Sequence, residues 1–338
     1  SPSATSGAGG GGAGRIAIYY TTKTFNGIVH AVSGKGPYYG GAGTIFTKQD
    51  AQAYGDLLIS NEGNFAGTSG AANTTIHENI TFDSFNISRG ASVILNGSFR
   101  INASFVNISD AWLTINMSAV LNVSKIEIDN GLIIKYGGLN VSSINATARR
   151  SNISGNLNVS KLTIMSGVIL SISGNLNTTT LTIPSTSILS HIPTLGSLNV
   201  TVINVTVEYG GTINVTGRGF EGVTSGDGNG PGGGIGTALT TNFGGGAGYG
   251  GRGGGSTSST TSFRGGQTYG SIKAPVELGS SGSANNGGGT SGAGGGAIFI
   301  NASDTLIVNG SIIANGLNGT GSGASNGQGA GAGGSIYL

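Results

Sequence analysis

Residues 157–164 read Leu-Asn-Val-Ser-Lys-Leu-Thr-Ile, and close relatives of this stretch recur along the middle of the chain. They begin at Leu121 (Leu-Asn-Val-Ser-Lys), Leu139 (Leu-Asn-Val-Ser), Leu176 (Leu-Asn-Thr-Thr-Thr-Leu-Thr-Ile) and Leu198 (Leu-Asn-Val-Thr), and Ile101-Asn102-Ala103-Ser104 is an earlier member. Successive copies lie 20, 18, 18, 19 and 22 residues apart. This period is typical of a β-solenoid, in which each coil buries against its neighbour the apolar surface that it could not bury alone.

The local pattern within the repeats indicates strands. Residues 79–216 form short segments in which Val, Ile, Leu and Thr alternate with polar residues at a period of two. Because successive side chains of a strand point to opposite faces, Leu and Val are expected to line the interior, and Asn and Ser/Thr to face outward. Gly turns such as Ser173-Gly174 and Gly210-Gly211 fit the corners. The predicted fold is all-β, a parallel β-helix (β-solenoid) with Gly-rich loops or a Gly-rich insertion.

The outward positions are rich in Asn-x-Ser/Thr triplets, which are acceptors for N-linked glycans in secreted proteins. Random placement of the 31 asparagines would give roughly seven triplets. The chain has nineteen, at Asn73, Asn79, Asn86, Asn96, Asn102, Asn107, Asn116, Asn122, Asn140, Asn145, Asn152, Asn158, Asn177, Asn199, Asn204, Asn214, Asn301, Asn309 and Asn318. The excess predicts glycosylation at these sites, hence covalent N-glycans, no other cofactor, and an extracellular or cell-surface location.

An unmodified asparagine ladder is the alternative interpretation of the same residues. Coils stack about 4.8 Å apart, so asparagines in register would crowd their sugars, whereas bare side-chain amides would hydrogen-bond from coil to coil. A ladder, however, requires nothing of the residue two positions later. The hydroxyl found there favours glycosylation at most sites, with the sugars splaying outward.

Composition excludes several classes of function. The chain of 338 residues has 68 Gly, 8% charged residues and a formal charge of +2, and its one adjacent basic pair, Arg149-Arg150, is expected to be a solvated turn. A nucleic-acid partner is therefore not expected. Cysteine is absent, so disulfides and Cys-ligated metals are excluded. No apolar run reaches the ~18 to 20 residues that cross a bilayer, so we expect no membrane span. The first residues, Ser-Pro-Ser-Ala-Thr-Ser, carry no signal-peptide pattern, so a secreted chain is expected to be a processed or excised segment.

The two ends repeat one pattern. Gly-Gly-Ala-Gly-Arg-Ile-Ala-Ile at Gly11 matches Gly-Gly-Gly-Ala-Ile-Phe-Ile at Gly294, residues 25–31 match 308–314, and residues 40–46 match 331–337. The chain is accordingly divided into an N-terminal Gly-rich β segment (1–65), triplet-rich coils (66–216), a Gly-rich insertion (217–291) and a C-terminal β segment (292–338). Because an unpaired strand is a template for more pairing, the repeated ends predict head-to-tail self-association into a polymer, by stacking or within a longer polypeptide.

The Gly-rich insertion admits two interpretations. Gly/Ser-rich sequence commonly behaves as a flexible linker. The alternative, which we favour, is an ordered insertion in which the missing side chains let extended backbones approach and hydrogen-bond to one another. Tyr249, Phe263, Tyr269 and Ile272 are the expected apolar anchors.

The repeated ends, together with the run from Gly40 to Lys48 and residues 54–59 (Tyr-Gly-Asp-Leu-Leu-Ile), resemble Gly-rich repeat modules of large secreted archaeal and bacterial surface proteins. The resemblance covers most of the chain. It implies parallel β-helices and carries over no enzyme activity to any residue. The dense triplets indicate an archaeal or eukaryotic glycosylation system, and the resemblance favours the archaeal one.

No residue set indicates catalysis or a metal. Glu127 and Asp129 share a strand face, as paired catalytic carboxylates would, but solvated acids explain them better. His30, His77 and His191 lack metal-ligand spacing and are expected at turns or the surface. Residues 225–230 resemble a calcium loop without its closing acid. Neither an enzyme nor a metal site is expected.

Carbohydrate binding is the remaining alternative. Aromatic residues that could stack on sugars are Tyr19, Tyr20, Tyr38, Tyr39 and Trp112, although strand packing or contact with a next subunit also explains them. The sequence thus predicts a heavily N-glycosylated extracellular structural protein that forms a filament or surface layer. An adhesin module that binds a surface carbohydrate is the alternative, and a polysaccharide-acting enzyme is less favoured.

Overall fold

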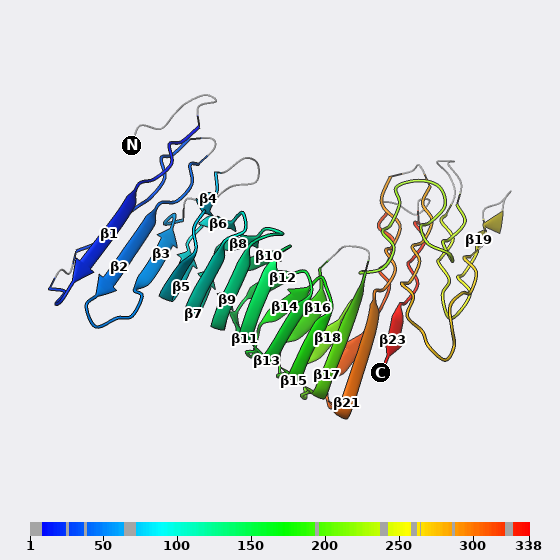
Figure 1. Cartoon of the computed structure of the whole chain (residues 1–338). Coiled ribbons are helices and arrows are strands. Elements are labelled where there is room, and N and C mark those ends of the chain that lie inside the picture. The colour runs from blue at the N-terminus through cyan, green and yellow to red at the C-terminus, as the bar shows by residue number, and fades with distance from the viewer. Residues whose placement is uncertain are drawn as a thin grey trace. The chain divides into compact units, whose positions relative to one another are not determined.

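The structure, a computed structural model, describes residues 9–24, 27–36, 39–63, 72–192, 196–236, 243–257, 262–263, 265–285, 288–321 and 327–338. These residues form strands and no helix, and the parallel sheets stack as a β-solenoid (Figure 1). The predicted fold class is confirmed. The chain divides into two compact units, which we call the first unit (residues 1–170 and 178–181) and the second unit (171–177 and 182–338). The predicted segment boundary at 65/66 lies outside the described residues.

The first unit contains two sheets. The larger sheet has, in spatial order, β1 (Arg15–Tyr20), β2 (Thr44–Gln49), β3 (Asp56–Ser60), β5 (Ile80–Ser88), β7 (Arg100–Ser109), β9 (Val120–Asp129), β11 (Gly138–Ala148) and β13 (Leu157–Ile164). The smaller sheet has β4 (Thr74–Ile76), β6 (Ser92–Leu95), β8 (Trp112–Ile115), β10 (Leu132–Lys135) and β12 (Arg150–Ser154). The division between the units runs through β14 (Ile169–Ile172) and β15 (Leu176–Ile183).

The second unit continues the same two kinds of strand. Its larger-sheet strands are β17 (Ser197–Val207), β21 (Ala297–Val308) and β23 (Ser335–Tyr337). Its smaller-sheet strands are β16 (Ile188–His191), β18 (Thr212–Asn214) and β22 (Ser311–Ile313). An antiparallel pair, β19 (Ser256–Thr257) and β20 (Ser262–Phe263), lies in the Gly-rich part.

Columns of aliphatic side chains form the core, as the alternation predicts. In the larger sheet of the first unit one column runs through Phe85, Val106, Ile126, Ile144 and Leu162, all at most 2% exposed. Opposite it, the smaller sheet contributes the fully buried column Val93, Leu113, Ile133 and Ile153. Each such side chain contributes roughly 1.5–3 kcal/mol through burial, so the stacked columns supply the cohesion between coils.

The corners of the coils require a left-handed residue. Arg89, Asp110, Asn130 and Arg149 follow β5, β7, β9 and β11 in turn, with φ between 46° and 52°. Gly210 occupies such a turn in the second unit at φ 81°, in keeping with the predicted Gly corner. Arg149 and Arg150 are both exposed, as expected, but only Arg149 lies in the turn, because Arg150 is the first residue of β12.

Strand direction changes once near the N-terminus. β1 and β2 are parallel to each other, but β2 pairs antiparallel with β3, whereas β3 and β5 are parallel. Figure 1 shows the blue arrows of β1 and β2 pointing opposite to β3. At the other end, β17, β21 and β23 are all parallel.

The Gly-rich insertion is ordered in its described residues. Extended segments hydrogen-bond through their backbones, for example Gly219 N to Gly294 O at 2.8 Å and Gly294 N to Phe220 O at 2.9 Å. A Cβ added to Gly294 would lie 1.8 Å from Gly279 O, so no larger residue fits there. The preferred interpretation is therefore confirmed, because these glycines permit backbones to pack directly against each other.

Two of the four predicted anchors of the insertion pack as expected, and one does not. Tyr249 and Tyr269 are in ring contact, with centroids 4.9 Å apart, and Tyr269 donates a hydrogen bond to Leu278 O. Ile272 is 100% exposed, so its assignment as an anchor was wrong. The side chain of Phe263 lies outside the described residues. The two tyrosines serve as anchors because their hydroxyls find polar partners: Tyr269 has the Leu278 carbonyl, and Tyr249 has the side chains of Glu277 and Ser335.

Candidate functional site

The triplet asparagines lie on the surface of the strands and turns, and none of the nineteen is buried. The exposed ones are Asn73, Asn79, Asn96, Asn140, Asn158, Asn177, Asn301, Asn309 and Asn318. The half-buried ones are Asn86, Asn102, Asn107, Asn116, Asn122, Asn145, Asn152, Asn199, Asn204 and Asn214. This distribution follows from the alternation: in Asn122-Val123-Ser124 the valine is 6% exposed, while the asparagine and the hydroxyl point outward together.

Asn102, Asn122 and Asn140 form a hydrogen-bonded row, which we call the asparagine ladder. Each is the third residue of its strand, and the strand registers place Asn122 opposite both of the others. Asn122 Nδ2 donates to Asn102 Oδ1 at 2.8 Å, and Asn140 Nδ2 donates to Asn122 Oδ1 at 2.8 Å. The row continues from Asn102 Nδ2 to Thr81 Oγ1 at 3.3 Å. The coil period of the sequence therefore brings together three of the predicted sites.

Two further amide pairs repeat this geometry. In the first unit Asn116 Nδ2 donates to Asn96 Oδ1 at 2.9 Å, beyond the ends of β8 and β6. In the second unit Asn199 Nδ2 donates to Asn175 Oδ1 at 3.0 Å. Asn175 belongs to no triplet, so the triplet pattern did not predict that it would pair. The signal that could have identified it is its place two residues before Asn177 in a corner.

Shallow hollows lie over both groups of amides. The asparagine ladder lines one of about 500 Å³ together with Ser124, Ser142 and Ser160. A second, of about 390 Å³, lies beside Asn175, Asn177 and Asn199 in the second unit. The walls of the first are mostly amides and hydroxyls. These groups donate and accept hydrogen bonds, which is the chemistry that sugar hydroxyls also use.

The candidate acids do not form a matched catalytic pair. Lys125 Nζ lies 2.6 Å from Glu127 Oε1, and the same ammonium is 5.7 Å from the centre of the Phe105 ring. Of the two candidate acids, Glu127 is therefore engaged in an ion pair with Lys125. Among the described residues, no three His, Asp or Glu side chains are grouped to hold a metal.

The loop at 225–230 is held by its own hydrogen bonds. Asp227 Oδ1 accepts from Gly236 N at 2.8 Å, and Asn229 Nδ2 donates to Glu221 O at 2.9 Å. Both polar side chains thus bind backbone groups of the neighbouring Gly-rich segments. Their observed role is to order the insertion.

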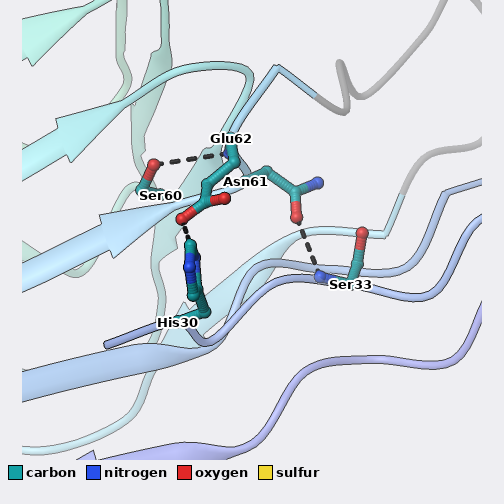
Figure 2. A network of polar contacts seen from close by, with 5 residues as sticks. All are labelled: His30, Ser33, Ser60, Asn61 and Glu62. Atoms are coloured by element: carbon teal, nitrogen blue, oxygen red, sulfur yellow. Dashed lines mark hydrogen bonds and ion pairs between the residues drawn. The ribbon is translucent and has the colours of Figure 1, made fainter. Parts of the chain in front are cut away.

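His30 takes part in a polar network near β3 (Figure 2). Its Nδ1 contacts Glu62 Oε1, and the residue that precedes Glu62, Asn61, accepts a hydrogen bond from Ser33 N at 3.1 Å. Asn61 is 2% exposed and also donates to Gly40 O at 3.5 Å. The network therefore joins the loop before β2 to the end of β3.

His191 does not lie at the surface, and the expectation for it was wrong. It is the last residue of β16 and is 2% exposed, with Nδ1 lacking a hydrogen-bond partner. Burial lowers the pKa of His191 below its usual value of 6.5, and the positive charge of Arg218 lowers it further. His30 and His77 are exposed, as predicted.

The candidate sugar-stacking aromatics are dispersed. Tyr19 is 70% exposed and packs edge-on against Phe46, and Tyr20 follows it on the opposite face of β1. Trp112 is 46% exposed on β8, and Tyr39 is half-buried. Tyr38 lies outside the described residues. The structure does not bring Tyr19 and Trp112 to one sheet, so they form no common platform.

Comparison with family profiles, curated proteins and solved structures returned no match. In the part of the chain that the structure describes, no helix has the length and apolar character needed to cross a membrane.

Proposed function

We propose that this protein is a heavily N-glycosylated extracellular structural protein, a subunit or repeat of a filament or surface layer assembled head-to-tail. The observation that carries the proposal is the placement of all nineteen triplet asparagines outside the core of a β-solenoid. Acceptor sites have to be accessible to be modified, and random surface residues would not maintain a hydroxyl two positions after each asparagine. The sugar would supply the solubility that a chain with 8% charged residues lacks.

The asparagine ladder is chemically compatible with glycosylation. A primary amide has two N–H donors, and Asn122 uses one of them toward Asn102. A sugar bonded to Nδ2 replaces one hydrogen and leaves the other to donate. A modified ladder therefore retains its coil-to-coil bond, and the spacing of neighbouring sugars is the remaining constraint. This removes the need to choose between the two interpretations of the asparagines.

The sheet edges support the head-to-tail arrangement. Among the described residues, β1 pairs with β2 alone and β23 pairs with β21 alone, so each has one edge on which no strand is paired. Such edges are templates for pairing with another strand. Because the two edges belong to opposite ends of the chain, pairing one with the other generates a polymer and not a closed dimer.

The exposed aromatics favour the structural proposal over an adhesin. The register of the smaller sheet aligns Trp112 with Leu132 and then with Asn152, a triplet asparagine. A glycan on Asn152 would overhang the face on which a carbohydrate ligand would have to stack. The same residue therefore argues for a coated surface.

Electron microscopy of native and deglycosylated protein tests the proposal. We expect native material to form filaments or sheets, and deglycosylated material to retain the subunit contact but to bundle laterally, since the sugar coat no longer separates the fibres. Native material that remains monomeric at all concentrations would overturn the proposal.

A further inference from the structure

The strands at the two ends of the chain obey one register rule. In the first unit Arg15 pairs with Thr44, and these residues directly follow Gly14 and Gly43. In the second unit Ala297 pairs with Ser335, and they directly follow Gly296 and Gly334. In both parallel pairs, the first residue after the glycines of one strand therefore lies opposite the first residue after the glycines of the other strand.

The glycines before these strands pack alike. A Cβ on Gly43 would lie 1.9 Å from Gly14 O, and a Cβ on Gly334 would lie 1.9 Å from Gly296 O. In each case the glycine-rich backbones of neighbouring segments touch directly. This contact fixes the register of the strands that follow, because a shift by one residue would place a Cβ against a carbonyl oxygen.

The side chains of the two pairs also correspond. Ile16 lies opposite Ile45, and Ile298 lies opposite Ile336. The next position holds a larger side chain in three of the four strands: Phe299 and Tyr337 have ring centroids 5.3 Å apart, and Phe46 lies opposite the small Ala17. Ala17 is exposed and thus leaves space beside β1.

We propose that β23 of one copy of the chain pairs in parallel with β1 of the next copy, with Ser335 opposite Arg15, Ile336 opposite Ile16 and Tyr337 opposite Ala17. The proposal rests on the head-to-tail association proposed above and specifies its contact. Parallel pairing follows from the glycines, which precede the strand in both copies. Only parallel strands place the two glycine-rich segments at the same end, where they can pack as they do within each copy.

In the proposed junction, the row of isoleucines at Ile298 and Ile336 continues into Ile16 and Ile45 of the next copy. The row at Phe299 and Tyr337 continues into Ala17 and Phe46 in the same way. Ile336 is 38% exposed in one copy and would be covered by Ile16 of the next. Tyr337 would lie over Ala17, the one position in its row without a bulky side chain. The junction thereby places the half-exposed ring of Tyr337 beside the small, exposed Ala17.

Disulfide trapping tests the register, and the chain offers a clean background because it has no cysteine. Registered residues of neighbouring strands have Cα atoms about 4.8 Å apart, which a disulfide spans. The test variant carries Ala17→Cys and Tyr337→Cys. The matched control carries Tyr19→Cys and Tyr337→Cys, which displaces one partner by about 6.6 Å along the strand on the same face. Both variants alter exposed or half-exposed residues.

Under mild oxidation of assembled protein, we expect the 17/337 variant to give a ladder of linked chains on a non-reducing gel, at least tenfold more than the 19/337 variant. Mass spectrometry of the linked peptides identifies the bond. Equal or greater linking in the control, or assemblies without a 17–337 bond, would overturn the register while leaving head-to-tail association intact. Absence of any assembly in the unmodified chain would overturn both proposals.

Discussion

Asn122 donates a hydrogen bond from its side-chain amide to Asn102 Oδ1 at 2.8 Å, although the two residues are 20 positions apart in the chain. The contact exists because the two strands stack in register, one coil apart, with their asparagines on the outer face. It links the repeat period to the surface chemistry. Whatever is attached to one asparagine of the row is presented directly beside the next.

Replacing Asn122 should weaken the solenoid, because Asn122→Ala removes a bond to Asn102 and another from Asn140. For unglycosylated protein we expect a loss of about 1–2 kcal/mol in the free energy of unfolding, measured by denaturant titration. The matched control is Ser124→Ala, which destroys the triplet but keeps the amide and should change stability by less than about 0.5 kcal/mol. In glycosylated protein both variants should lose one glycan. Equal stability losses would contradict the ladder's contribution.

Close backbone contact between the Gly-rich insertion and the C-terminal segment predicts strong sensitivity to single methyl groups. Gly294→Ala would place a Cβ 1.8 Å from Gly279 O, so we expect about 3 kcal/mol or more of destabilisation in thermal or chemical unfolding. Gly254→Ala is the control, because no atom lies within 4 Å of its added Cβ. A Gly294→Ala protein as stable as the control would mean that these segments do not pack as described.

A glycine at the left-handed corner position Arg149 should stabilise the protein. This residue has φ 46°, a conformation that costs an L-residue roughly 1–2 kcal/mol but that glycine adopts freely. Arg149→Gly should therefore raise the free energy of unfolding by up to about 1 kcal/mol after the entropy cost of glycine is subtracted. Arg150→Gly, one position later in β12, should lower it by about 0.5–1 kcal/mol. A destabilised Arg149→Gly protein would count against the left-handed corner.

The burial of His191 predicts that the folded protein loses stability in acid. Its pKa in the folded protein is lowered by burial, so the unfolded chain binds a proton at higher pH than the folded chain does. The contribution of this group is complete above its unfolded pKa of 6.5 and is lost as the pH falls below that value. His191→Leu should reduce the difference in stability between pH 7.5 and pH 5.5, and the exposed His77→Leu should leave it in place. An unchanged pH profile in His191→Leu would contradict the assignment.

The coils could be predicted because the pattern that specifies each strand lies within a single repeat. The Leu-Asn-Val-Ser units specify strand, face and spacing at once, so the inner columns and the outer asparagines follow from the alternation alone. The structure of the Gly-rich insertion was harder to predict, because glycine has no side chain and so shows no alternation of apolar and polar residues. Its order depends on contacts between backbones that are far apart in sequence, such as Gly219 with Gly294.

Other features depended on tertiary context. Nothing local distinguishes His191 from a surface histidine, because its burial comes from its position at the end of β16. Nor does the repeat between the two ends reveal that β2 and β3 pair antiparallel, whereas β17 and β21 pair in parallel. The partner of Asn199 proved to be Asn175, which lies outside the triplet pattern.

Intact mass spectrometry of the native protein, before and after removal of N-glycans, tests the central claim most directly. The account predicts a mass well above the 33.2 kDa of the polypeptide, falling toward that value on deglycosylation, with the modification mapped to Asn102, Asn122 or Asn140 among other triplets. A native mass of 33.2 kDa with these asparagines unmodified would contradict it.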